Sequence, residues 1–109
     1  MQGICIKIFM SEVTRHHGKL LFEWLLEEAR SLGIPGATVF RGTAGFGRHR
    51  VMHEETFFEL AGELPVELEI VARQDQIDQL MERIRQEKLK VFYVKFPAEY
   101  GVLDGSDQS

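Results

Sequence analysis

Apolar and polar residues alternate along the chain with two different periods, and the order of these patterns predicts four strands and two helices. Near the start, Ile4, Ile6 and Ile8 alternate with other residues, as in a strand that buries one face. Farther on, Leu21 and Leu25 belong to a stripe at helical spacing. Over the whole chain, this reading predicts a strand at 4–10, a helix at 19–32, a strand at 36–40, a strand at 65–72, a helix at 75–88 and a strand at 90–96.

The ends of these elements are marked by capping and breaking residues. Ser11 or Thr14 is expected to cap the first helix, and Gly33 is expected to end it. Pro97 is expected to end the last strand. The apolar stripe of the first helix is wide, which fits either a thick core or a flank that packs on another subunit.

The order β-α-β-β-α-β predicts an α+β, ferredoxin-like fold, an antiparallel sheet with both helices on one face and the first and third strands in the middle. The other face of the sheet is then left open. On it, Lys7 would lie opposite Glu67 or Glu69 as a cross-strand ion pair. The same face would also carry apolar residues that favour self-association, namely Phe9, Val71, Phe92 and Phe96.

The stretch 41–48 ends the second expected strand with three glycines and two arginines in eight residues. Arg41 and Arg48, with backbone N–H groups of Gly45 and Gly47, form a candidate site for a phosphate or carboxylate. A plain tight loop with surface arginines is the alternative. The connection to the third strand is roughly 20 residues long, where hairpins use about 2–5, and connections of that length are usually functional or mobile.

Composition limits the classes of function. The chain has 109 residues, a net charge of −4 and a single cysteine, Cys5. The acidic balance argues against binding to nucleic acid, and no apolar run is long enough to insert into a membrane. One cysteine excludes an internal disulfide, and the first residues lack a secretory pattern. We therefore expect one domain in the cytoplasm.

The inventory of chemical groups favours binding over catalysis. The serines lack the context of a nucleophile elbow and no phosphate-binding P-loop motif is present, so an enzyme is not predicted. His49 and His53 are spaced to share one side of a helix and, with Glu54 or Glu55, are an alternative divalent-metal site. The pair at 16–17 precedes the first helix, where it either contacts a neighbour or ligand or lies on the surface.

Several motifs together resemble a known family. Gly-Phe-Gly-Arg at 45–48, the long connection, Leu-Pro-Val-Glu-Leu-Glu-Ile-Val at 64–71 and a helix from about Asp75 look like the PII signal-transduction superfamily. The longer match, with Gly-Ile-Pro-Gly-Ala-Thr-Val-Phe-Arg-Gly at 33–42, is similar to the PII-like family called domain of unknown function 190. The match covers about residues 4–98.

The resemblance implies a homotrimer with ligand clefts between subunits. In PII proteins the Gly-Phe-Gly-Arg segment helps to hold an adenine nucleotide, so Gly47, Arg48 and His49 would lie at such a cleft. The following loop would contact a partner, a transporter or an enzyme. Two parts of the PII pattern are missing, because the connection at 86–90 has no glycine and the C-terminal segment is acidic. The identity of the ligand therefore stays open.

The sequence thus predicts a non-enzymatic PII-like regulator over residues 1–100, followed by a disordered tail at 101–109. The predicted ligand is a small anion, with an adenine nucleotide as the candidate, bound by Arg41, Gly45, Gly47, Arg48 and His49. The alternatives are a trimeric module that binds a divalent metal through His49 and His53, and an interaction protein without a ligand.

Overall fold

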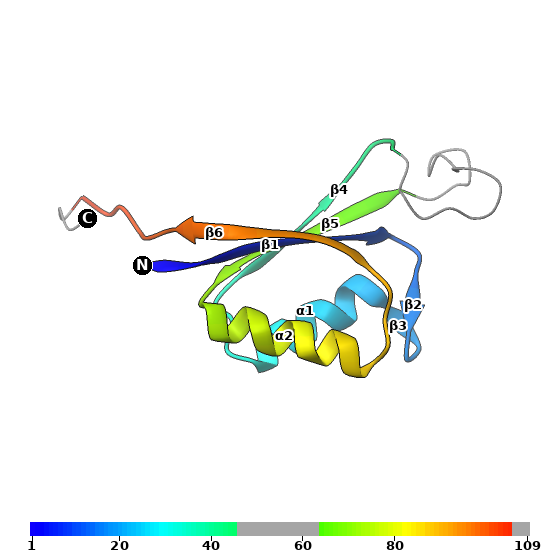
Figure 1. Ribbon diagram of the computed structural model, residues 1–109. Coiled ribbons are helices and arrows are strands. Elements are labelled where there is room, and N and C mark those ends of the chain that lie inside the picture. The colour runs from blue at the N-terminus through cyan, green and yellow to red at the C-terminus, as the bar shows by residue number, and fades with distance from the viewer. Residues whose placement is uncertain (46–63, 106–109) are drawn as a thin grey trace.

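The computed structural model describes residues 1–45 and 64–105. Its elements are β1 (Gln2–Ser11), β2 (Arg15–His16), β3 (Lys19–Leu20), α1 (Leu21–Ser31), β4 (Ala37–Arg41), β5 (Pro65–Ala72), α2 (Gln74–Gln86) and β6 (Phe92–Glu99). One antiparallel sheet has the order β4-β5-β1-β6, so the first and third expected strands are central, as predicted. Figure 1 shows both helices on one side of this sheet, which confirms the α+β, ferredoxin-like arrangement.

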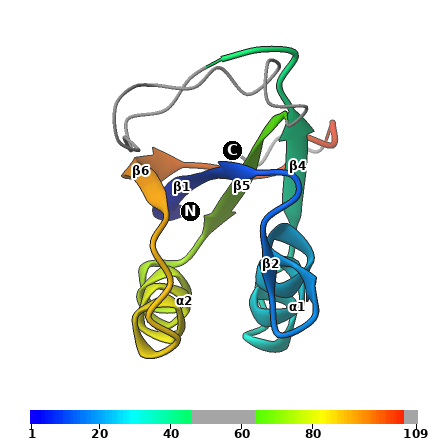
Figure 2. The ribbon, with the colours of Figure 1, turned by 90° about the vertical axis from the view of Figure 1, so that its right-hand side faces the viewer.

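The core lies between the sheet and the two helices, which run side by side beneath it (Figure 2). The alternation of β1 and β5 sends every second side chain toward the helices, and strand pairing places Ile6 beside Ile70 and Ile8 beside Leu68. Each helix closes the core with one apolar stripe. The fully buried large side chains are Ile6, Ile8, Leu25, Leu68, Ile70, Ile77 and Leu80.

The stripe of α1 is wide because it fills this core. Phe22 and Leu26, which broaden the stripe, are partly buried and pack against the core cluster. The contacts favour the thick-core interpretation of this helix. Within residues 1–45 and 64–105, neither helix is long and apolar enough to cross a bilayer.

Polar side chains join the two helices to each other. Arg83 of α2 donates to Glu28 Oε1 and to Ser31 Oγ of α1, each at 2.7 Å. The buried Gln76 side chain donates to the Gly33 carbonyl at 2.9 Å and accepts from the Arg73 N–H at 3.2 Å. Gly33 has a φ of 81°, a conformation that suits glycine after a helix, so its predicted role in ending α1 is confirmed.

The entry into α1 differs from the prediction. Residues 15–20, expected to hold part of a loop and the first helical residues, form the hairpin β2–β3, and α1 therefore begins at Leu21. The expectation that Ser11 or Thr14 caps α1 with its side chain was wrong. The N-cap is Leu20, which makes no side-chain capping bond, and Thr14 instead offers its carbonyl to the Leu21 N–H at 2.7 Å.

The last strand also runs farther than predicted. β6 continues to Glu99, and Pro97 lies within it opposite Ile4 of β1, so the prediction that Pro97 ends the strand was wrong. The reason is that β6 is an edge strand with a ladder on one side alone, where a residue without an N–H is tolerated. Beyond it, the Tyr100 N–H donates to the Met1 carbonyl at 2.9 Å.

Candidate functional site

The end of β4, where the sequence predicts an anion site, is held tightly against the start of β5. The Gly42 N–H donates to the Pro65 carbonyl at 2.7 Å. A Cβ atom on Gly42 would lie 2.8 Å from Pro65 Cγ, so a side chain at this position would force the two segments apart. Glycine is therefore needed here for close approach, and it brings the preceding Arg41 to the edge of the sheet.

Arg41 is paired with an acidic residue from the other side of β5. Its Nε donates to Glu12 Oε1 at 2.7 Å, and the Glu12 N–H donates to the Leu64 carbonyl at 2.8 Å. The register explains this contact, because Ser11 and Arg41 lie opposite the adjacent residues Pro65 and Val66. Sequence reasoning missed Glu12, because this contact depends on the register of three strands in the finished sheet.

The Arg41 side chain remains 64% exposed in spite of this pair. A guanidinium has five N–H donors in a planar fork, so one bond to Glu12 does not exhaust its capacity to bind an anion. The described part of the predicted site thus consists of Arg41 and Gly45. Gly47, Arg48 and His49 lie outside the described residues, as do His53, Glu54 and Glu55 of the alternative metal site.

The sheet face turned away from the helices carries an apolar surface. We call it the open sheet face, and from the strand register it consists of Cys5, Lys7, Phe9, Thr38, Phe40, Glu67, Glu69, Val71, Phe92, Val94 and Phe96. Phe9 and Phe92 pack with ring centroids 5.7 Å apart. Phe40, Val94 and Phe96 are between 40% and 49% exposed. The predicted cross-strand pair is present, with Lys7 Nζ at 3.9 Å from Glu67.

Cys5 lies in the middle of the open sheet face and is nevertheless buried. Burial, followed by the nearby charge of Glu69, raises the pKa of its thiol above the ordinary value of 9.0. Such a thiol is protonated and weakly reactive at neutral pH, which favours a packing role over a catalytic one.

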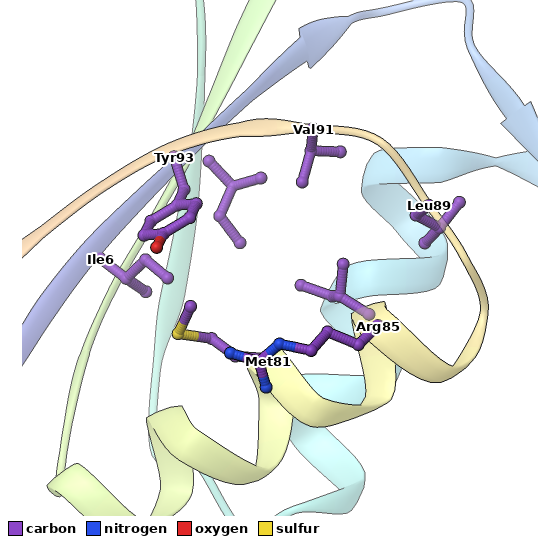
Figure 3. Close-up of a pocket in the computed structure, with 8 residues that line it drawn as sticks. Ile6, Met81, Arg85, Leu89, Val91 and Tyr93 are labelled. Carbon is purple, nitrogen blue, oxygen red and sulfur yellow. The ribbon is translucent and has the colours of Figure 1, made fainter.

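The helix side of the sheet has a small apolar pocket between α2 and β6. Its volume is about 200 Å³, and its lining is Ile6, Ile8, Met81, Ile84, Arg85, Leu89, Val91 and Tyr93. Figure 3 shows Val91 and Tyr93 pointing from the β6 side toward Met81 and Arg85 on α2. Arg85 is the one charged residue of the lining, and it pairs with Glu82 at 3.1 Å. Small-molecule sites usually measure about 300–1,000 Å³, so this pocket suits an apolar side chain better than a nucleotide.

Two neighbouring histidines meet one carboxylate at the end of α2. His16 Nε2 and His17 Nε2 lie 3.0 Å and 2.9 Å from Glu87 Oε1. Hydrogen bonds first from His17 and then from His16 lower the pKa of Glu87 below its ordinary value. The sequence placed this histidine pair before the first helix, either in contact with a neighbour or ligand or on the surface. Glu87 could not be assigned, because it is 70 residues away along the chain.

Comparisons with known proteins agree on one family and one fold. The family model DUF190, described as uncharacterized ACR, COG1993, matches residues 3–93. A UPF0166 protein of Aquifex aeolicus (strain VF5) is 38% identical over 80 residues, which are 73% of this chain and 76% of that protein. A UPF0166 protein of Methanocaldococcus jannaschii is 30% identical over 79 residues, 72% of each chain.

Solved structures with the same fold are more distant in sequence. CPII, a nitrogen regulatory PII-like protein from Thiomonas intermedia K12 solved with ADP, AMP and bicarbonate, has a TM-score of 0.66 and 11% identity, covering 95% of this chain and 98% of that one. A Thermus thermophilus protein described as PII-like has a TM-score of 0.61 and 17% identity, covering 90% and 88%. At these identities the likeness concerns the fold.

Proposed function

We propose that this chain, which belongs to the DUF190 family and has a PII-like fold, is a non-enzymatic regulator. We further propose that it is a cytoplasmic homotrimer. A small anion binds in a cleft between subunits, and an adenine nucleotide is the first candidate. Binding shifts the conformational population of the connection after β4. Through that connection the protein modulates a partner, a transporter or an enzyme.

The observation that carries the ligand class is the placement of Arg41. Its guanidinium stands exposed at the edge of the sheet, where β4 enters the predicted Gly-Phe-Gly-Arg segment. Arginine forks bind phosphate and carboxylate through paired hydrogen bonds. The PII-like protein CPII was solved with ADP, AMP and bicarbonate, all of which are anions. The proposed site therefore combines Arg41 and Gly45 with Gly47, Arg48 and His49.

The open sheet face supports the proposal of self-association. Phe40, Phe92 and Phe96 each leave between 42% and 50% of their surface exposed on one side of the sheet. Half-exposed aromatic side chains on one surface are typical of a protein–protein interface. Packing of this face against copies of itself would cover them and would also bring the β4 ends of different subunits into one assembly.

The ligand is best tested by isothermal titration calorimetry of the full chain with ADP, AMP and ATP. The proposal predicts binding by the wild type and a loss of affinity in Arg48→Ala. Hydrogen bonds to a charged group contribute about 1.5–3 kcal/mol, so the loss should be about 10- to 150-fold. Arg30→Ala is the matched control, because Arg30 is an exposed arginine on α1 and its loss should leave affinity unchanged.

Two results would contradict this proposal. If neither the nucleotides nor a broader anion screen that includes bicarbonate gives heat of binding, the sensing function is wrong. If a nucleotide binds but Arg48→Ala and Arg41→Ala both bind it as well as the wild type does, the ligand occupies another place on the protein.

A further inference from the structure

His16, His17 and Glu87, which we call the hairpin cluster, converge from two distant parts of the chain. The ligating atoms of these three side chains all lie within 4.8 Å of one another. Both Nε2 atoms approach the same carboxylate oxygen, Glu87 Oε1, at 3.0 Å and 2.9 Å. These three side chains are close enough to one another to share a metal ion. They were found among the histidine, cysteine and carboxylate side chains of residues 1–45 and 64–105.

The turn of the β2–β3 hairpin makes this convergence of neighbouring residues possible. Consecutive side chains of a strand point to opposite faces, so His16 and His17 would diverge in an extended segment. His17 and Gly18 instead have φ values of 55° and 80°, as in the two-residue turn of a tight hairpin. The backbone therefore turns at His17, and its ring comes back to the carboxylate that the His16 ring also reaches.

The third group is fixed by the end of a helix. Glu87 is the C-cap residue of α2, and its N–H donates to the Arg83 carbonyl at 3.1 Å. The next residue, Lys88, has a φ of 57° and turns the chain away from the helix axis. The carboxylate is thus supplied by the end of a helix, and the two imidazoles are supplied by a tight turn.

The two rings differ in how firmly they are held. The rings of His16 and Trp24 pack in a T-shaped arrangement, with centroids 4.8 Å apart and an interplanar angle of 82°. Its side chain is 15% exposed, whereas that of His17 is 62% exposed. One ligand is therefore packed against the core, and the other stands at the surface, where an ion can enter from solvent.

We propose that the hairpin cluster binds a divalent transition-metal ion, such as Zn²⁺ or Cu²⁺, through two imidazole nitrogens and one carboxylate oxygen. Two histidines and a glutamate form a known ligand set for zinc, with the fourth position left to water. Ligand atoms about 2.0–2.2 Å from a tetrahedral ion lie about 3.3–3.6 Å apart, so both N···O distances need to lengthen by only about half an ångström. Imidazole suits both ions, and Cu²⁺ binds such sites more tightly. The hairpin cluster shares no residue with the anion site proposed at the end of β4.

The chain contains its own reporter for this site, because it has one tryptophan, Trp24, and that residue contacts His16. The experiment is a titration of the metal-free full chain with Cu²⁺ while Trp24 fluorescence is followed. We expect saturable quenching at one ion per chain, reversal by a chelator, and a shift of the curve to higher Cu²⁺ when Zn²⁺ is present as competitor.

Two variants assign the quenching to its ligands, and a third serves as the control. His17→Gly removes one imidazole and keeps a residue that accepts a positive φ, and Glu87→Gln removes the charge while keeping the shape. Each should weaken binding at least about tenfold. The control is His49→Ala combined with His53→Ala, which removes the alternative metal ligands and should leave the curve unchanged.

A second measurement separates binding from folding. Thermal unfolding of each variant without metal should resemble that of the wild type, and Zn²⁺ should raise the melting temperature of the wild type more than that of His17→Gly. The proposal is overturned if the wild type shows no saturable quenching, or if His17→Gly and Glu87→Gln bind as the wild type does. It is also overturned if the His49/His53 variant alone loses the ion. None of these outcomes depends on nucleotide binding.

Discussion

Phe96 offers the sharpest test of whether the open sheet face is covered in an assembly. In the single chain this residue is 42% exposed. Complete coverage of a phenylalanine buries about 150–250 Å², so covering the exposed part removes about 80 Å² of apolar surface from water. At about 25 cal/mol per Å² this corresponds to about 2 kcal/mol per subunit, or roughly a thirty-fold change in an association constant. Phe96→Ala should therefore weaken assembly clearly.

A matched control lies on the same strand. Tyr93 is 44% exposed but points to the helix side, where it lines the small pocket. Phe96→Ala and Tyr93→Ala both remove an aromatic ring from β6, so both should lower the stability of the chain to a similar degree. Analytical ultracentrifugation over a dilution series should show dissociation of Phe96→Ala at concentrations where Tyr93→Ala and the wild type remain assembled. Equal assembly of the two variants, or a monomeric wild type, would refute the reasoning.

Three further predictions concern single residues. Arg41→Ala breaks an exposed ion pair with Glu12, so chemical denaturation should show a loss of at most about 1 kcal/mol, while calorimetry shows weaker anion binding. Gly42→Ala should cost about 1–3 kcal/mol in the free energy of unfolding, because its Cβ would crowd the start of β5, whereas Gly36→Ala, with open space around it, should cost less. Cys5 has a raised pKa and is buried, so its thiolate fraction at pH 8 is low. Alkylation by iodoacetamide should be slow in the folded protein and fast in urea, and equal rates would contradict the burial.

The parts of the fold that follow from local periodicity could be predicted from the sequence. The alternation in β1 and β5 identifies both the strands and their buried faces, and Gly33 marks the end of α1 correctly. The order of elements then suffices for the strand order, because few topologies accommodate β-α-β-β-α-β. Lys7 beside Glu67 follows from that order as well.

The parts that depend on tertiary context could not be predicted in the same way. The β2–β3 hairpin has two residues in each strand, which is too short for a periodic pattern. β6 continues through Pro97 because it is an edge strand, where a residue without an N–H is tolerated. Its edge position is a property of the assembled sheet. The contacts of Arg41 with Glu12 and of His16 with Glu87 join residues 29 and 71 positions apart, so they require the register and the packing of the finished fold.

The central claim is that the protein is an assembly of identical chains with an anion site between them. Native mass spectrometry of the full chain with ADP or AMP tests it most directly, because subunit number and bound ligand are read from one mass. The account predicts a species of three 12.6-kDa chains that carries nucleotide, and an Arg48→Ala species of the same subunit number without it. A single-chain mass, or a trimer whose nucleotide content is unchanged in Arg48→Ala, would contradict the account.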